Sequence, residues 1–554
     1  MTWPRSNLAR QQPETRLTRM HPLFWRRLLA KFVATLLSAS VTLTAPALAQ
    51  VRLPALGESA SDDLSVGAEK RLGEQIMREG RRDPQYLDDP VLLEYLQQLW
   101  NPLVAAARAR GDINAETDQA FAWEAFLVRD RSVNAFALPG GYVGVHLGLM
   151  ALTTAGDQLA SVLAHELTHV TQRHIARSIA PQQRASMVAI AAFLLGIIAA
   201  SRSSNIDAAN AAIVGGQAAA IQGQLNFSRD VEREADRIGY GVLTDAGYSP
   251  AGMAAMFEKL DIATRLNDNG GFPYLRSHPL TVDRIAEARN RALLGGGAMP
   301  APTVQHAVMQ MRARVLMDDS AQSLQRFSGG TSSPLLADRV AALYGGALAA
   351  SLLRDPARAE SRAAEALSLA ATATRREPLA ERAVTLLQAQ LRLARGDATG
   401  ALGALDSLRS SPTERPPLLL RAQALLELQR AAPGSQAVPL RESTEALQTW
   451  VAEHPQDPAA WEELAATSDA LGLKLRAMRA AAEARWVVGD LTGAIDRLRA
   501  AQQASRGATG QDFIEGSVID SRLRHITAQR RQLQLESREG RGGRSGGAEE
   551  PPPQ

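Results

Sequence analysis

The order of structural periods along the chain limits its possible folds more than any single motif does. Residues 65–109 place apolar side chains at helical spacing, and residues 123–150 then read as strands turned back on one another at Pro139-Gly140-Gly141. From about residue 303 onward alanine, leucine and arginine dominate and strand patterns disappear. A chain of 554 residues is long enough for two or more domains. We therefore expect an α+β domain followed by an all-α domain.

Residues 1–49 have the features of a cleaved export signal. Basic residues at 26–31 precede a short apolar stretch, and Ala47-Leu48-Ala49 is a cleavage site of small residues. A membrane anchor is the alternative, but the apolar stretch is too short to span a bilayer. We expect cleavage after Ala49, with translation beginning at Met1 or Met20.

Charge and cysteine content exclude several kinds of site. The chain has 61 basic and 58 acidic residues, of which 54 and 57 lie after residue 49. This slightly acidic balance does not favour a nucleic-acid partner. The chain has no cysteine, which excludes a thiol nucleophile, a disulfide framework and a cysteine-based zinc knuckle.

The stretch "SVLAHELTHVTQRH" (161–174) carries the strongest chemical signal. On a helix His165 and His169 lie about 40° apart, so both can bind one metal ion. Glu166 projects in a neighbouring direction, from which it can take a proton from a water molecule. The alternative is a helix that happens to carry two histidines. His174 lies about 140° from His169 on the same helix, so we expect it to be structural.

A third ligand is sought among histidines and acids, because cysteine is absent. The segment "SRDVEREADRIGY" (228–240) offers four carboxylates on one expected helix. Glu232 and Asp236 are four residues apart and share a face, so Glu232 can ligate while Asp236 hydrogen-bonds a ligand imidazole. A solvated charged face is the alternative.

The helical half contains two similar junctions, "ARGDATGAL" (394–402) and "VVGDLTGAI" (487–495). In each, one helix ends at Gly-Asp and another begins, which is typical of tetratricopeptide-type repeats. The segment 457–472 supplies an opening helix of the same kind. A generic helical bundle is the alternative. The tail 536–554 is charged, rich in Gly and Pro, and expected to be disordered.

An apolar segment, "MVAIAAFLLGIIAA" (187–200), lies between the two groups of expected ligands. It is too short to cross a bilayer. We expect a buried helix or an apolar lid, with peripheral contact at a membrane surface as the alternative.

The two ligand motifs together identify a family resemblance. The HExxH motif followed by "EREADRIG" (232–239) resembles the CAAX-prenyl-protease-like zinc metallopeptidases, and the similarity covers roughly residues 65–295. Segments around "NAFALPGGYVGVHLGLM" and "SHPLTVDRIAEA" resemble the soluble periplasmic branch that carries tetratricopeptide repeats. The resemblance implies one zinc ion per chain held by His165, His169 and Glu232. It implies that Glu166 is the general base and that Asp236 orients a ligand.

The resemblance also implies roles for two other segments. Asn134, Ala135, Phe136 and Ala137 would form an edge strand that pairs with the backbone of a substrate. An ordinary hairpin is the alternative. His278, in "SHPL", would reach the site and could act as a removable zinc ligand that regulates activity, or serve only in packing. Arg284 would stabilise the oxyanion formed during attack.

The expected organisation is a signal peptide (1–49), a zinc metallopeptidase domain (50–300), a linker with a first helix (301–335), a tetratricopeptide-like domain (336–535) and a disordered tail (536–554). The resemblance implies a periplasmic zinc endopeptidase in protein quality control of the cell envelope. Its substrates would be misfolded or stalled outer-membrane proteins, and its repeats would dock the outer-membrane assembly machinery. The alternative is a chaperone or assembly factor whose protease is seldom active. An inactive scaffold is disfavoured, because all five expected site residues are present.

Overall fold

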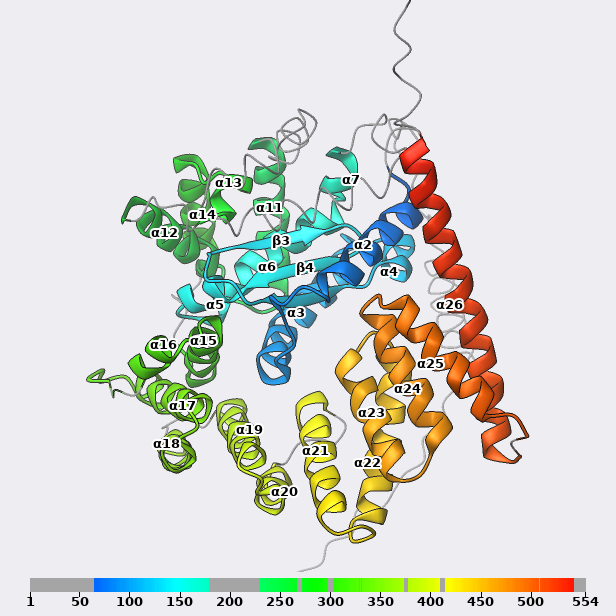
Figure 1. Cartoon of the computed structure of the whole chain (residues 1–554). Coiled ribbons are helices and arrows are strands. Elements are labelled where there is room, and N and C mark those ends of the chain that lie inside the picture. The colour runs from blue at the N-terminus through cyan, green and yellow to red at the C-terminus, as the bar shows by residue number, and fades with distance from the viewer. Residues whose placement is uncertain are drawn as a thin grey trace, which may run out of the picture. The chain divides into compact units, whose positions relative to one another are not determined.

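The computed structural model confines the strands to one early stretch of the chain (Figure 1). The described residues are 64–178, 229–266, 272–296, 302–327, 329, 331–372, 377–408, 414–507 and 509–542. Within them, the strands lie between Tyr86 and His146, and only helices follow. The expected export signal, the cleavage site after Ala49 and the apolar segment 187–200 fall outside the described residues.

Within the described residues, four strands form one sheet in the order β1-β2-β4-β3. Their bounds are Tyr86–Leu87 (β1), Glu124–Val128 (β2), Ala135–Leu138 (β3) and Tyr142–His146 (β4). β2 and β4 are parallel, and the other two pairs are antiparallel. The predicted turn between β3 and β4 is confirmed, with Gly140 and Gly141 at φ of 79° and 92°, where glycine is favoured. β3 is the last strand at one end of this sheet.

One segment that the sequence predicts as strand is helical. The strand pattern was expected to continue through Met150, but β4 ends at His146 and helix α5 (Leu147–Leu152) follows at once. Leu147, Leu149 and Met150 are buried in this helix. A short apolar run fits a buried strand and a buried helix equally well, so the periodicity could not separate the two.

A central helix, α6, organises the first part of the molecule. The helices of this part are α2 (Val66–Gly80), α3 (Pro90–Arg110), α4 (Ala115–Ala120), α6 (Gly156–Thr171), α7 (His174–Ser178), α11 (Arg229–Asp245), α12 (Ala251–Leu266), α13 (Tyr274–Ser277) and α14 (Val282–Leu294). α6 packs against α3, α11 and α12 and against strands β3 and β4. Every side chain from Gln158 to Val170 is buried. Side chains on α6 are therefore held on all sides by neighbouring elements.

The first two described helices, α2 and α3, begin where the sequence predicts. The Ser65 hydroxyl accepts a hydrogen bond from the Ala68 amide at the start of α2. α3 begins at Pro90, directly after Asp89, whose carboxylate accepts a hydrogen bond from the Leu92 amide and caps the helix. It ends before Gly111, which has a φ of 78°.

The second part consists of helices that pack in sequence. They are α15 (Val304–Met317), α16 (Ala321–Arg326), α17 (Leu336–Leu352), α18 (Pro356–Ala370), α19 (Pro378–Ala394), α20 (Ala398–Asp406), α21 (Arg415–Ala431), α22 (Ala437–Glu453), α23 (Pro458–Ala470), α24 (Lys474–Val487), α25 (Leu491–Ala504) and α26 (Gln511–Gly542). From α17 onward each helix packs against its successor. α26 continues past residue 536, where the tail was expected to begin. None of the described helices is long and apolar enough to cross a membrane.

The two Gly-Asp junctions have the same local structure. Gly396 and Gly489 have φ of 80° and 76°, and each is followed by an aspartate that caps the next helix. The Asp397 carboxylate accepts from the Gly400 amide at 2.8 Å, and Asp490 accepts from Gly493 at 2.9 Å. A Cβ at the third position after each aspartate would lie within 2.3 Å of the capping carboxylate, so a larger residue there would require the aspartate side chain to shift.

Helix α15 connects the helical part to the sheet-bearing part. It packs against α3, α5, α17 and α19. Its Arg312 donates to both oxygens of Asp89, at 2.6 and 2.7 Å, and to the Tyr344 hydroxyl at 2.7 Å. His306 Nδ1 lies 2.6 Å from the Tyr95 hydroxyl. These five side chains are buried, and the apolar core continues past them from one part into the other.

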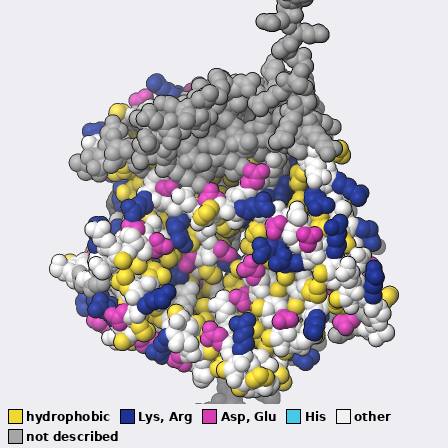
Figure 2. Space-filling model, in the orientation of Figure 1, with side chains coloured by type: hydrophobic (Ala, Val, Ile, Leu, Met, Phe, Trp, Pro, Cys, Tyr) yellow, Lys and Arg dark blue, Asp and Glu magenta, His cyan; other side chains and the backbone are white. Residues whose placement is uncertain are grey.

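Charges of both signs are interspersed over the described surface on the face shown in Figure 2, with apolar side chains between them. This mixed pattern follows from the nearly equal numbers of basic and acidic residues.

Candidate metal centre

Two potential ligands lie on one face of α6. His165 and His169 are each 1% exposed, and their Nε2 atoms are 3.0 Å apart. Their four-residue spacing produces this arrangement, because it returns the side chain to nearly the same direction on the helix. The pair that the sequence predicts is therefore brought together in the buried core.

Helix α11 brings a carboxylate to the same point. Glu232 is 1% exposed, with Oε2 at 3.4 Å from His165 Nε2 and Oε1 at 3.5 Å from His169 Nε2. The close packing of α11 on α6 depends on Gly239, where a Cβ would lie 3.1 Å from the Ala164 carbonyl oxygen. The glycine of the second motif thus helps to position the acid that begins it.

A third imidazole completes the group. His278 follows α13, is 3% exposed, and its ring stacks on Tyr274 with centroids 4.7 Å apart. Its Nδ1 lies 3.0 Å from Glu232 Oε1 and 3.3 Å from His165 Nε2. The four residues His165, His169, Glu232 and His278 place one ligand atom each within 4.8 Å of one another.

These separations fit a single tetrahedral metal ion. With bonds of about 2.0–2.1 Å, the ligand atoms of a tetrahedral site lie about 3.3 Å apart. The observed distances between the ligand atoms, from 3.0 to 3.5 Å, lie on both sides of that value. Imidazole nitrogens and one carboxylate oxygen are also a donor set found at metal sites in proteins.

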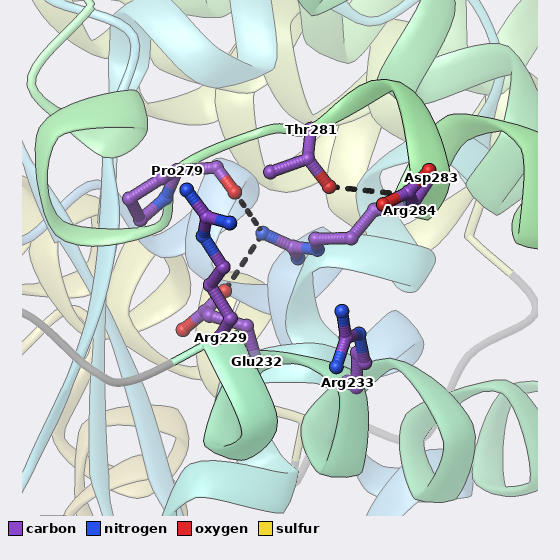
Figure 3. Close-up of a pocket in the computed structure, with 7 residues that line it drawn as sticks. All are labelled: Arg229, Glu232, Arg233, Pro279, Thr281, Asp283 and Arg284. Atoms are coloured by element: carbon purple, nitrogen blue, oxygen red, sulfur yellow. Dashed lines mark hydrogen bonds and ion pairs between the residues drawn. The ribbon is translucent and has the colours of Figure 1, made fainter.

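A buried arginine, Arg284, contacts two acids of the site, and its contact with Glu232 is drawn in Figure 3. Asp236 Oδ1 lies 3.0 Å from Nδ1 of His165, in the position expected for an acid that orients this ligand. Arg284 Nε and Nη2 donate to the two Asp236 oxygens at 2.6 and 2.8 Å. Its Nη1 contacts Glu232 Oε2 and the Pro279 carbonyl oxygen, both at 2.8 Å. Arg284 was expected to face an oxyanion, but its donors are directed at two carboxylates and a carbonyl.

The pKa values in the group reflect its buried charges. Burial alone lowers the pKa of His165, but hydrogen bonds with Asp236 and Glu232 raise it to about 10. Burial and the neighbouring imidazoles of His165 and His278 hold the pKa of His169 well below its usual value. Burial raises the pKa of Glu232, but the nearby imidazoles of His278 and His165 depress it far more. Asp236 and Glu232 thus favour the protonated form of His165, and a bound metal ion would take the place of that proton.

Glu166 differs from the other acids of the group because both of its carboxylate oxygens lack a hydrogen-bond partner among the described residues. It is fully buried. Nε2 of His278 lies 3.5 Å from Oε1 of Glu166. Buried polar atoms are almost always hydrogen-bonded, and an orphaned carboxylate beside four ligand atoms is typical of a reactive centre.

Comparison with known proteins agrees with this geometry. The sequence profile of peptidase family M48 matches residues 94–292. The beta-barrel assembly-enhancing protease of Yersinia pestis is 31% identical over 491 residues, which are 84% of this chain and 92% of that protein. The chain belongs to peptidase family M48. The family resemblance drawn from the two motifs is confirmed, and the candidate site lies inside the matched range.

Two further relatives of this M48 chain match it over a shorter stretch. The beta-barrel assembly-enhancing protease of Escherichia coli strain K12 is 38% identical over 271 residues, 48% of this chain and 53% of that protein. A counterpart in Vibrio cholerae serotype O1 is 41% identical over 253 residues, 45% of this chain and 49% of its own length. In these matches the chain spans about half the length of the relatives.

The M48 domain places the expected substrate strand at the end of the sheet. Ala135, Phe136 and Ala137 lie in β3, directly after Asn134, and β3 pairs with β4 on one side only within the described residues. β3 also packs against α6, which carries the two histidines. The edge strand and the ligands therefore lie on adjoining elements.

Two neighbours of the site were not found from the sequence. Tyr274, 2% exposed, lies under the rings of His165 and His278. His174 was expected to point away from the metal ligands, but its Nδ1 lies 2.8 Å from Nδ1 of His169. Helical periodicity does not indicate this contact, because the helix ends between the two histidines.

Proposed function

We propose that this M48 chain is an exported zinc endopeptidase that acts on proteins of the cell envelope. The observation that supports this most strongly is the convergence of His165, His169 and Glu232 beside the unsatisfied carboxylate of Glu166. Three protein ligands with an adjacent base are the arrangement of a metal-assisted hydrolase. The family and the names of the relatives also describe peptidases.

The residues of the site divide the work of peptide hydrolysis. His165, His169 and Glu232 would hold zinc, which when bound polarises the peptide carbonyl and lowers the pKa of water. Glu166 accepts a proton from the attacking water as the water oxygen bonds to the carbonyl carbon. As the C–N bond breaks, Glu166 returns that proton to the nitrogen, so that a carboxylic acid and an amine are released. The acid then passes its remaining proton through solvent to the amine, which leaves a carboxylate and an ammonium group.

The decisive experiment replaces the base and keeps the ligands. Glu166→Gln should retain zinc and thermal stability while casein cleavage falls by about 10²–10⁴-fold, the usual contribution of a general base. The matched control is Glu74→Gln, because Glu74 lies at the surface on α2. Casein cleavage at the wild-type rate by Glu166→Gln would contradict the mechanism.

His278 supports a second proposal, that the enzyme is held inactive until its loop moves. A catalytic zinc needs a position open to water, and His278 lies where a fourth protein ligand would close it. Purified His278→Ala should therefore show higher basal proteolysis than the wild-type protein. Unchanged or lower cleavage with zinc and fold intact would leave His278 a packing or substrate-binding role.

Arg284 is assigned two alternative roles that one variant separates. If it only positions Asp236 and Glu232, Arg284→Ala weakens zinc binding and activity together. If it also stabilises an oxyanion, as the family resemblance implies, activity falls while zinc affinity is kept. In the second case Arg284 must release Glu232 and contact the substrate instead.

We propose that substrates add to β3 as an extended strand. Main-chain pairing at a sheet edge provides affinity with little dependence on side chains, which suits an enzyme for misfolded proteins. The relatives are named for assembly of β-barrels, so misfolded or stalled outer-membrane proteins in the periplasm are the proposed substrates. Peripheral membrane contact through residues 187–200 belongs to the same proposal.

An assembly-factor role is the second candidate function, and it would rest on the helical part as a tetratricopeptide-like solenoid. The repeated Gly-Asp junctions and the sequential packing of α17 to α26 support that architecture. A hollow of 440 Å³ between α23, α24 and α25 is lined by apolar side chains, among them Ala466, Ala477 and Met478, and by charged ones that include Asp469 and Arg485. This surface would dock the outer-membrane assembly machinery. Rescue of outer-membrane assembly by Glu166→Gln would favour this role over proteolysis.

A further inference from the structure

The chain leaves the path of the ligand helix directly after that helix ends. α6 ends at Thr171 and α7 begins at His174, and Arg173 between them has a φ of 53°. This left-handed conformation is uncommon for a residue other than glycine and costs about 1–3 kcal/mol. This break in the helix places His174 next to His169, whereas a continuous helix would leave the two side chains about 140° apart.

Buried contacts hold Arg173 in this conformation. Its Nε donates to Glu69 Oε2 at 2.8 Å, and its Nη2 donates to the carbonyl oxygen of Leu64. The Glu69 carboxylate is buried and the Arg173 side chain is 22% exposed, so this ion pair is partly shielded from water. A left-handed residue directly after the C-cap is a common way to end a helix, and here it places His174 beside His169.

His174 lies between a metal ligand and an acid. It is 2% exposed, its Nδ1 lies 2.8 Å from His169 Nδ1, and its Nε2 lies 3.2 Å from Glu234 Oε2. Arg177 Nη2 donates to the same Glu234 oxygen at 3.3 Å. Glu234 stands between Glu232 and Asp236 in the second motif, and the proposed mechanism has not used it.

The position of the metal site determines the direction of these hydrogen bonds. His169 turns Nε2 toward the other ligand atoms, so that nitrogen must keep its lone pair and the ring hydrogen must be on Nδ1. His169 then donates to Nδ1 of His174, which leaves the His174 hydrogen on Nε2, directed at Glu234. Each nitrogen has one consistent role along the chain.

We propose that His174 and Glu234 are positioning residues that orient His169 for zinc. This His174–Glu234 relay rests on the proposed zinc site. Ligand histidines normally donate their second nitrogen to a carboxylate or carbonyl. His165 contacts its carboxylate, Asp236, directly at 3.0 Å. His169 is linked to a carboxylate, Glu234, only through the imidazole of His174.

Zinc affinity, measured by competition with a chromophoric chelator, tests the relay. His174→Phe keeps the ring volume but removes the acceptor, and should weaken zinc binding by about 10–100-fold, as loss of an outer partner usually does. His174→Asn places an amide oxygen near the Nδ1 position and should restore most of that loss. The visible spectrum of the Co²⁺-loaded protein should change with Phe and return toward the wild-type spectrum with Asn.

His306→Phe is the matched control, because His306 is also 2% exposed but lies on α15 away from the ligands. It should leave zinc affinity unchanged even where it lowers stability.

Equal zinc affinity in wild type and folded His174→Phe, or equal weakening by Phe and Asn, would overturn the relay. If His174→Phe does not fold, Glu234→Ala replaces it, because that side chain is 32% exposed and its removal leaves no buried cavity. If Glu234→Ala then binds zinc as tightly as the wild-type protein does, the relay is overturned. If the wild-type protein itself binds no zinc, the proposed function is overturned instead.

Discussion

Two buried polar groups lie close to the sheet, and they differ in what remains unsatisfied. The first, here called the α15 group, consists of Arg312, Asp89, Tyr344, His306 and Tyr95. Arg312 donates to Asp89 and Tyr344, His306 lies within hydrogen-bond distance of Tyr95, and each of these polar side chains has a partner. In the metal centre, ligand atoms from three segments converge within 4.8 Å, and both oxygens of Glu166 lack a partner in the described chain.

The difference separates structure from chemistry. A complete set of partners indicates that a buried charge joins elements, because nothing remains to bind or react. Several lone pairs directed at one point indicate that the protein alone does not complete the group. Substitutions in the α15 group should therefore change stability and leave metal binding alone, and substitutions of metal ligands should do the reverse.

The largest effect is expected at Glu232. Glu232→Ala removes a ligand and should weaken zinc binding by more than the about 10–100-fold expected for an outer partner. Glu234→Gln is the control, because its amide oxygen can still accept from His174 and zinc should be largely retained. Metal content after dialysis and chelator competition measure both. Full zinc in Glu232→Ala and none in Glu234→Gln would reverse the ligand assignment.

The next effect is expected at Arg312. Arg312→Met leaves the carboxylate of Asp89 buried without its charge partner, which typically costs about 3–5 kcal/mol. Adding Asp89→Asn should recover much of this loss, because the amide oxygen can still cap the Leu92 amide. Thermal unfolding and zinc affinity are measured together. A fall in zinc affinity as large as that at Glu232 would remove the distinction between the two groups.

The smallest effect is a pH dependence at His306. Burial lowers its pKa from 6.5 to about 4, although a hydrogen bond with the Thr153 carbonyl opposes the shift. Between these values the unfolded chain binds a proton that the folded chain does not, so stability falls as pH falls and is unaffected above about 6.5. The loss should reach about 2 kcal/mol at pH 5 and about 3 kcal/mol near pH 4.

The His306 contribution is isolated by comparison with His306→Gln. The wild-type unfolding midpoint should decrease more between pH 7.5 and pH 5 than that of the variant. Equal decreases in both proteins would mean that His306 titrates normally in the fold. Zinc affinity at pH 7.5 should be the same in both, since His306 belongs to the α15 group.

Much of the local structure was predictable, because it depends on neighbours in sequence. The cap at Ser65, the glycine turn before β4 and the Gly-Asp junctions follow from the hydrogen-bonding and backbone preferences of a few residues. The strand expected through Met150 was wrong because a short apolar run lacks a period long enough to distinguish helix from strand.

The same distinction applies to the metal centre. The sequence by itself determined that His165 and His169 share a face, and that Glu232 and Asp236 do, because a helix repeats every 3.6 residues. The tertiary structure decided what meets these faces. Arg284 reaches two carboxylates from another helix, and His174 reaches His169 only because Arg173 breaks the helical period. Such contacts depend on how distant segments pack and on a backbone conformation that other segments stabilise. The spacing of residues along one helix predicts neither of these.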